Sequence, residues 1–363
     1  MHDLGDKKWM QIAIHTAKRQ LGRTYPNPAV GAVIVKDDMM LAKAATGDQG
    51  TPHAEFNAIN KLNKEQLLGA TLYVTLEPCD HIGKNPSCSN LIIASGIKTV
   101  VIACIDINPI VRGKGVKKLT DSGIEVRILN DAAAKDLHKM FFSFISLKLP
   151  YLTCKIATSL DGKIALSNKD SKWITSQISR NYVHLLRSRH DAIMTGVGTV
   201  ISDDPLLNCR INGYLQHRLV IILDRNLAVP LASNIFSANS EREIWLYTTS
   251  NDQLKIAKLQ QMGVKIIIFA EDEYNDPVNI LSNIAQKNIS SIFLEAGQLI
   301  TKFIKADLIN RLIIFRSGQF FGQDGFDMCG NLFLNNIMEA RKYNLVKVKN
   351  INNKDVIEEY IKS

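Results

Sequence analysis

The sequence predicts a fold of two α/β domains in series, and three observations lead to this prediction. A chain of 363 residues is longer than one hydrophobic core usually supports. An apolar fraction of 46% beside a charged fraction of 22% is that of an ordinary globular protein, so both domains have core material. Short β-branched strands alternate with helical segments, and this alternation begins again near residue 149. We therefore expect helices on both faces of a mostly parallel sheet in each domain.

Turn and cap residues divide the first 148 residues into elements. Helical periodicity at the N-terminus ends at the Tyr-Pro-Asn-Pro turn, because Pro28 disfavours helix at Asn27. Pro52 favours a helix start just after it, and Gly96 is typical of a helix end. The expected order is helix 1–22, strand 29–35 with a turn at 36–38, helix 54–62, strand 70–76, helix 87–95, strand 99–103 and a connecting helix 131–147.

The second domain, residues 149–363, has the same kind of pattern. Short runs of Val, Ile, Leu and aromatic residues indicate buried strands, and one longer segment has helical spacing. The expected order is strand 151–157, helix 177–189 and strands 192–195, 218–223, 243–247, 264–268 and 292–294.

Charge and cysteine usage limit the class of protein. The 44 Lys and Arg exceed the 35 Asp and Glu, and a net charge of +9 suits an anionic ligand, whether nucleic acid or a phosphorylated metabolite, without selecting one. No segment has the apolar core of a signal peptide or the roughly 20 apolar residues of a membrane span. The six cysteines form no compact disulfide framework. We therefore expect a cytoplasmic protein with reduced thiols and no membrane partner.

Two short motifs in the first domain predict a metal site. A Pro-His-Ala-Glu run at 52–55 precedes a Glu-Pro-Cys run at 77–79, and Cys88 follows at an expected helix start. Zinc deaminases hold their metal with one His and two Cys and use a nearby Glu to move protons. The pattern therefore assigns His53, Cys79 and Cys88 as zinc ligands and Glu55 as the catalytic acid and base. The helix start is expected to favour a thiolate at Cys88. The isolated cysteines at 104, 154, 209 and 329 are expected to be buried and without a role.

The spacing of the two cysteines points to a particular family. Nucleic-acid deaminases usually carry Cys-x-x-Cys, whereas eight residues separate Cys79 from Cys88 here. The run Glu-Pro-Cys-Asp-His-Ile-Gly-Lys-Asn-Pro-Ser-Cys at 77–88 resembles the deaminase half of the bifunctional riboflavin-biosynthesis family RibD. The runs Thr-Tyr-Pro-Asn-Pro at 24–28 and Asp-Ile-Asn-Pro at 106–109 match two further motifs of that family. The resemblance implies a cytidine-deaminase-like α/β/α domain.

The same resemblance implies which residues contact the substrate in this domain. They are Asn27, His81, Lys84 and Asn108, and Lys84 is suited to a phosphate as a mobile point charge. One position departs from the family pattern. Six residues before Pro52 the family has a substrate-contacting His, and this chain has Thr46. We expect weaker phosphate or ribose binding at that position because a hydroxyl carries no charge.

The second domain resembles the reductase half of the same family, which has a dihydrofolate-reductase-like α/β fold and uses NADPH. The resemblance rests on the runs at 152–163, 171–175, 191–199 and 203–210 and on Leu-Glu-Ala-Gly at 294–297, and it fades after Gly297. It implies catalytic roles for Lys155, Asp203 and Glu295. It implies an NADPH site at Ala157, Trp173, Thr199, Asp203 and Gly297, and substrate contacts at Ser171, Arg187, Leu207, Arg210 and Glu295. Arg187 and Arg210 are expected to hold the substrate phosphate through paired N–H donors.

The family resemblance implies two reactions in sequence. The domain of residues 1–148 deaminates 2,5-diamino-6-ribosylamino-4(3H)-pyrimidinone 5′-phosphate, and residues 149–363 reduce the ribosyl group to a ribityl chain with NADPH. A pyrimidine nucleotide partner, no nucleic acid and a homo-oligomer are expected with it. Two alternatives stay open from the residues themselves: a tRNA or nucleoside zinc deaminase, favoured by the basic charge, and a degenerate zinc-stabilised binding protein, suggested by Thr46 and the divergent C-terminal third.

Overall fold

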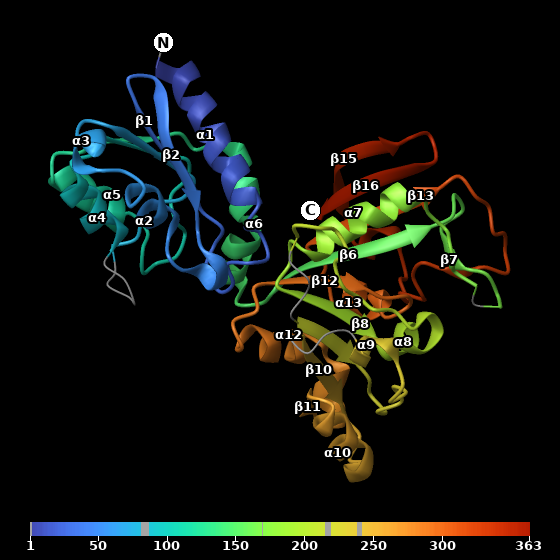
Figure 1. The fold of residues 1–363 in the computed structure, drawn as a ribbon. Coiled ribbons are helices and arrows are strands. Elements are labelled where there is room, and N and C mark those ends of the chain that lie inside the picture. The colour runs from blue at the N-terminus through green and yellow to red at the C-terminus, as the bar shows by residue number, and fades with distance from the viewer. Residues whose placement is uncertain (1, 81–86, 169, 215–218, 238–241) are drawn as a thin grey trace. The chain divides into compact units, whose positions relative to one another are not determined.

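The computed structural model describes residues 2–80, 87–168, 170–214, 219–237 and 242–363. Within it the chain divides into two compact units, Met1–Leu149 and Pro150–Ser363. Each unit has its own sheet and its own core, and we describe them separately as the first unit and the second unit (Figure 1).

The first unit contains a five-stranded sheet of mixed direction. The three strands predicted from β-branched runs are present, and two more strands extend the sheet at its edges. β1 pairs antiparallel with both of its neighbours, so only half of this sheet is parallel and the expectation of a mostly parallel sheet is wrong for this unit. In sheet order the strands are β2 (Met39–Ala45), β1 (Gly31–Lys36), β3 (Thr71–Val74), β4 (Thr99–Ile102) and β5 (Glu125–Ile128).

Helices cover both faces of this sheet, as Figure 1 shows. The N-terminal helix α1 (His2–Lys18) and the long helix α6 (Ala132–Leu147) pack together on one face, and the other face carries three helices. Those three are α2 (Ala54–Ile59), α4 (Cys88–Ser95) and α5 (Lys114–Asp121), while a single turn α3 (Lys64–Leu67) precedes β3. The core between the layers is apolar and includes Met10, Ile14, Leu72 and Ile92, all fully buried.

Helix ends in this unit follow the expected local chemistry. Gly96 closes α4 in the left-handed conformation (φ 80°), which glycine adopts without steric cost. Asp131 caps α6 by accepting from the N–H of Ala134. α1 ends at Lys18, four residues before the expected end, and residues 19–23 form turns.

The second unit is built on a nine-stranded sheet that is parallel over most of its width. In sheet order, the strands from β11 across to β13 all pair in parallel with their neighbours. The strands β16 and β15 then add an antiparallel hairpin at one edge. In sheet order the strands are β11 (Val264–Ile268), β10 (Glu243–Thr248), β9 (Leu219–Leu223), β8 (Ala192–Gly196), β12 (Ser291–Glu295), β6 (Tyr151–Thr158), β13 (Arg311–Ser317), β16 (Asp355–Lys362) and β15 (Tyr343–Ile351). A short ribbon of β7 (Lys163–Ala165) and β14 (Phe326–Asp327) lies outside this sheet.

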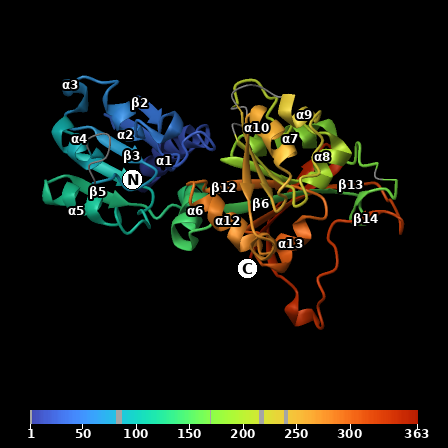
Figure 2. The ribbon, with the colours of Figure 1, turned by 90° about the horizontal axis from the view of Figure 1, so that it is seen from below.

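Helices again lie on both faces of the sheet. Figure 2 shows α7, α8, α9 and α10 on one side of the sheet and α12 and α13 on the other. α7 packs through Val183 and Leu186 onto Phe293 and Phe315 of the sheet. The helices are α7 (Gln177–Arg187), α8 (Val197–Asp203), α9 (Asn234–Ser237), α10 (Gln253–Gln261), α11 (Glu271–Asn275), α12 (Pro277–Ala285) and α13 (Ile300–Lys305).

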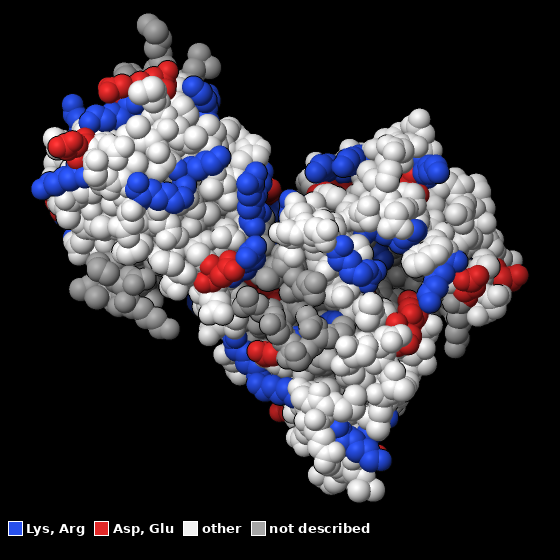
Figure 3. All heavy atoms as spheres, viewed as in Figure 1, with Lys and Arg blue, Asp and Glu red and all other residues white. Residues whose placement is uncertain are grey.

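The surface carries both signs of charge. On the face drawn in Figure 3, Lys and Arg lie in several separate groups with Asp and Glu between them. Among the described residues, none of the helices is long and apolar enough to cross a membrane.

Candidate active sites

Three side chains distant in sequence meet beside the starts of two helices in the first unit. His53 immediately precedes α2, and Cys88 is the first residue of α4, after the N-cap Ser87. Nδ1 of His53 lies 3.2 Å from Sγ of Cys88 and 3.5 Å from Sγ of Cys79. One ligand atom from each residue lies within 4.8 Å of the others. The structure therefore brings together the three residues that the motifs assigned as metal ligands.

This donor set fits a zinc ion. Zinc bonds to sulfur at about 2.3 Å and to imidazole nitrogen at about 2.0 Å, so the ligand atoms of a tetrahedral site lie about 3.5 Å apart. The separations of His53 from the two thiols agree with that value. Two thiols and one imidazole favour zinc over harder metal ions, and three protein ligands leave a fourth position open, as catalysis requires.

Glu55 lies in the first turn of α2 beside the cluster. It is 4% exposed, and this burial raises the pKa of its carboxyl to about 7, with His53 opposing the rise. A carboxyl with a pKa near neutrality can both take and return a proton at working pH. The position and pKa of Glu55 therefore suit the acid and base role.

Before a metal binds, the pKa values of the two thiols shift in opposite directions. Contact with Cys88 and with His53 lowers the pKa of Cys79, so the thiolate lies there. Contact with Cys79 and burial raise the pKa of Cys88. Zinc binds both cysteines as thiolates, so the thiolate expected at Cys88 stays a prediction.

Two of the four substrate positions implied for the first unit are described. Asn27 donates from Nδ2 to the carbonyl of Gly50 at 3.0 Å, which fixes its amide. Gly50 has a φ of +81°, and a Cβ there would lie 2.7 Å from Cβ of Asn27. Asn108 accepts from the N–H of Ile110 and is half-buried. His81 and Lys84 lie outside the described residues.

Glu77 organises the loop beside the cysteine ligand, a role that the sequence did not reveal. Its buried carboxylate accepts from the N–H groups of Asp106, Gly113 and Val116. It thereby ties the turn that carries Cys79 to the segment that carries Asn108. The Glu-Pro-Cys motif was the available signal, but the partners lie at least 29 residues away.

Thr46, the residue that departs from the family pattern, is buried, and its hydroxyl forms hydrogen bonds within the protein. It is 2% exposed, and its hydroxyl accepts from the N–H of Val30 at 3.0 Å and donates to the carbonyl of Pro28 at 3.3 Å. The side chain therefore holds the end of β2 against the chain that enters β1. Its hydroxyl is not available as the weak substrate contact that we expected.

A Thr46→Val variant should be less stable by about 1–3 kcal/mol, because the buried N–H of Val30 loses its acceptor. Urea unfolding followed through the buried Trp9 measures the change. Thr16→Val is the matched control, since the Thr16 hydroxyl only donates to the Ile12 carbonyl within α1. Unchanged stability together with a raised KM for deamination would show instead that the Thr46 hydroxyl reaches substrate.

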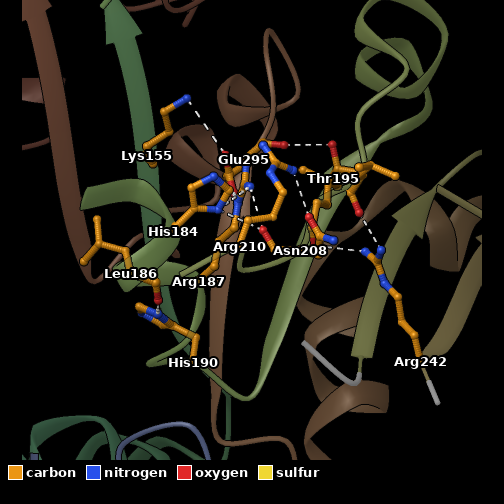
Figure 4. Close-up of polar contacts among 12 residues, drawn as sticks. Lys155, His184, Leu186, Arg187, His190, Thr195, Asn208, Arg210, Arg242 and Glu295 are labelled. Atoms are coloured by element: carbon orange, nitrogen blue, oxygen red, sulfur yellow. Dashed lines mark hydrogen bonds and ion pairs between the residues drawn. The ribbon is translucent and has the colours of Figure 1, made fainter. Parts of the chain in front are cut away.

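A second polar cluster lies at the carboxyl ends of the central strands of the second unit. Glu295 is the last residue of β12, and Lys155 is its register partner on β6 (Figure 4). Arg187 of α7 donates to both carboxylate oxygens of Glu295, at 2.5 Å and 3.0 Å. Nζ of Lys155 lies 3.9 Å from Oε2 of the same carboxylate. Burial alone raises the pKa of Glu295, but Arg187 and Lys155 hold that pKa below its ordinary value. Glu295 is therefore an anion between two cations.

Arg187 forms more hydrogen bonds within the protein than expected. Its third nitrogen, Nη1, donates to the carbonyl of Asn208 at 3.0 Å. The paired donors that we expected to hold phosphate are those that bind Glu295. Arg210 is exposed and donates only from Nη1, to the side-chain oxygen of Asn208 at 2.9 Å, among the contacts described for it. Leu207 is buried at 3% exposure, so its side chain packs in the core.

The structure also describes the remaining positions implied for the second unit. Asp203 ends α8, and its carboxylate lies 3.5 Å from the hydroxyl of Ser171. Trp173 is 67% exposed and stacks with the guanidinium of Arg180 at 4.3 Å. The other three positions are half-buried: Ala157 on β6, Thr199 in α8 and Gly297 just after β12.

Comparison with known proteins finds matches to both units. The family model of the RibD C-terminal domain matches residues 150–357. The model of the cytidine and deoxycytidylate deaminase zinc-binding region matches residues 4–104.

Similar proteins span both units together. The riboflavin biosynthesis protein RibD of Aquifex aeolicus is 39% identical over 348 residues, which is 95% of this chain and 96% of that protein. The RibD protein of Bacillus amyloliquefaciens is 41% identical over 85% of this chain and 83% of its own length. A solved structure from Thermotoga maritima, a diaminohydroxyphosphoribosylaminopyrimidine deaminase/5-amino-6-(5-phosphoribosylamino)uracil reductase, is 34% identical with a TM-score of 0.88 over the whole of both chains.

Proposed function

The chain belongs to the RibD family of riboflavin-biosynthesis proteins, and from that membership we propose that residues 1–148 carry the deaminase reaction and residues 149–363 the reductase reaction. The protein is a zinc-dependent deaminase and an NADPH-dependent reductase. The observation that carries the residue assignment is the meeting of His53, Cys79 and Cys88 beside the buried Glu55.

The first reaction hydrolyses an amine from the pyrimidine ring of 2,5-diamino-6-ribosylamino-4(3H)-pyrimidinone 5′-phosphate. Zinc held by His53, Cys79 and Cys88 supplies a Lewis acid that makes water acidic enough to attack at neutral pH. Glu55 takes a proton from the attacking water and delivers it to the departing amine, so that ammonia leaves as the ring carbon gains oxygen. Asn27 and Asn108 orient the ring, with His81 and Lys84 assigned to the same pocket by family resemblance.

The second reaction reduces the ribosyl carbon that is joined to nitrogen. NADPH supplies the hydride, and the protein binds, orients and moves protons. Lys155, beside Glu295, is the proton donor that we assign to the reacting sugar, and Asp203, which accepts from the hydroxyl of Ser171, is assigned to the same site by family resemblance. Arg210 contacts the substrate phosphate, and Arg187 holds Glu295 in place. Ala157, Trp173, Thr199, Asp203 and Gly297 would hold the cofactor, as the family resemblance implies.

We propose a free nucleotide, and not a nucleic acid, as the substrate. The eight-residue separation of the cysteines differs from the Cys-x-x-Cys of nucleic-acid deaminases. The basic side chains visible in Figure 3 are divided by acidic ones and form no continuous stripe on that face. We propose a cytoplasmic location because Cys79 and Cys88 must stay reduced to bind metal.

We propose that the second unit self-associates through β15. This strand lies at the edge of the sheet, where backbone groups lack a neighbouring strand. Leu345, Val346 and Val348 are all more than half exposed on it. Val348→Asp should therefore lower the mass measured by sedimentation equilibrium. Leu254→Asp on α10, where the apolar side chain is also exposed, should not. A mass equal to one chain for the unaltered protein would exclude self-association.

Removing zinc tests whether the first unit carries the deamination and the second unit the reduction. After dialysis against a chelator, ammonia release from the diaminopyrimidine nucleotide should cease, because the Lewis acid is gone. NADPH oxidation with 5-amino-6-(5-phosphoribosylamino)uracil should continue, and Cys79 should become reactive towards a thiol reagent. Added zinc should restore ammonia release. Deamination that survives complete removal of the metal would overturn the assignment of the site.

A further inference from the structure

The segment 204–210 carries Asn208 and Arg210 to the polar cluster of the second unit, and its backbone is strained. Asp204 has a φ of 42° and Leu207 a φ of 44°, both in the left-handed region. This conformation is unfavourable for residues other than glycine and persists only where the surroundings hold it. Asn234 holds the first of them, because its backbone N–H and side-chain amide both donate to the carboxylate of Asp204.

Arg242, which immediately precedes β10, holds the second strained residue. Its Nη1 donates to the carbonyl of Leu206 at 2.5 Å, and its Nη2 donates to the carbonyl of Leu207 at 3.0 Å. One planar guanidinium therefore bridges two consecutive carbonyls. The flexible ammonium of lysine offers no such fork. Nothing in the sequence around Arg242 marked it for a role.

The next carbonyl is held from the other direction. The Asn208 carbonyl accepts from Arg187 and from Nδ1 of His184, each at 3.0 Å. Figure 4 shows Arg187 and Arg242 reaching Asn208 and its neighbours from opposite sides. The side-chain oxygen of Asn208 in turn accepts from Arg210. Two arginines thus fix three successive carbonyls just before the exposed Arg210.

We propose that Arg242 is a positioning residue of the reductase, which holds the 204–210 segment so that Arg210 meets the anionic group of the nucleotide substrate. The inference rests on the proposed function only in placing the substrate at Arg210. Arg242 itself contacts main-chain oxygens of the segment. Its removal therefore weakens substrate binding and leaves the cofactor site and the deaminase unit as they are.

The local electrostatics show that a simple apolar packing role does not account for an arginine here. Burial and the charge of Arg187 lower the pKa of Arg242 to about 10. The Nε atom of Arg242 is buried without a hydrogen-bond partner among the described residues. Keeping this cation buried is therefore unfavourable in itself, and its two hydrogen bonds to the strained segment offset that cost.

Arg242→Lys and Arg242→Met in the full chain test the proposal. Lysine keeps the charge without the fork, and methionine removes both. We expect either variant to raise the KM for the aminouracil nucleotide about tenfold with a smaller change in kcat, because a misplaced binding group weakens ground-state and transition-state binding alike. The KM for NADPH and the rate of ammonia release should be unchanged. Arg225→Met is the matched control, since Arg225 pairs with Glu271 at an exposed site.

Four further outcomes decide the matter. If Arg242→Lys has the kinetics of the unaltered protein, the charge and not the fork is sufficient, and the positioning role is overturned. A rise in both KM values, or a loss of ammonia release, would show a general loss of structure and would also overturn it. Arg210→Met separates the inference from the proposed function: if this variant leaves the nucleotide KM unchanged, the substrate assignment itself fails. If Arg210→Met raises KM while both Arg242 variants do not, only the inference fails.

Discussion

Replacing Glu55 by glutamine is expected to abolish ammonia release while zinc stays bound. The amide keeps the size of the buried side chain, but it cannot take a proton from water and return it to the departing amine. The rate should fall about 10³-fold, within the range that general acid and base catalysis contributes. Ammonia release from the diaminopyrimidine nucleotide and zinc content by atomic absorption measure the two properties separately.

The second unit provides an internal control for the Glu55 experiment. Glu55→Gln should oxidise NADPH with the aminouracil nucleotide at the rate of the unaltered protein, because the residues proposed for the reductase lie in the second unit. Glu65→Gln changes an exposed acidic residue in the first turn of α3 and should alter neither reaction. Full turnover by the zinc-loaded Glu55 variant would remove the proton-transfer role from this residue.

The strands that sequence predicted well are rich in Val, Ile and Leu. β11 has the expected bounds of 264–268, and β9 differs from the expectation by one residue. Both lie inside or at the edge of a parallel sheet, where continuous runs of Val, Ile and Leu indicate a strand without any need for alternation.

Two of the strands that sequence reasoning missed, β2 and β15, have a mixed composition or an exposed surface. β2 consists of Met, Ala, Leu and Lys, and its first two residues are exposed, so neither β-branching nor burial marked it. β15 is exposed along most of its length and alternates apolar residues with Lys347 and Lys349. Such strands depend on pairing with a neighbour that lies elsewhere in the chain, and a local pattern does not record that pairing.

The candidate sites were predictable to different degrees for a physical reason. The zinc ligands and Glu55 lie in two short motifs and at one helix start that follows them, and the metal demands these particular donors. Contacts in the second unit join residues far apart in the chain: Arg187 and Glu295 are 108 residues apart, and Arg242 reaches back 36 residues to Leu206. The spacing of residues in the sequence cannot show that Arg187 binds a carboxylate and not a phosphate. The paired N–H donors of a guanidinium suit both groups.

Removing the charge of Glu295 should have the largest effect on the second unit. Glu295→Gln leaves the buried Arg187 without its anion and removes the negative charge beside Lys155. Breaking one side of a buried ion pair costs about 3–5 kcal/mol of stability. We expect the rate of NADPH oxidation to fall about 100-fold as the site loses its geometry. Glu271→Gln, which breaks an exposed pair with Arg225, should cost at most about 1 kcal/mol.

A double variant separates stability from catalysis at this pair. In Arg187→Met with Glu295→Gln, neither partner is left as an uncompensated buried charge, so most of the lost stability should return. Reduction should stay slow, because Lys155 and the substrate still lack the carboxylate. Urea unfolding and NADPH absorbance measure the two effects, and ammonia release reports on the intact first unit. If the double variant recovers both stability and reduction, Glu295 serves only to neutralise Arg187, and its place in the chemistry is lost.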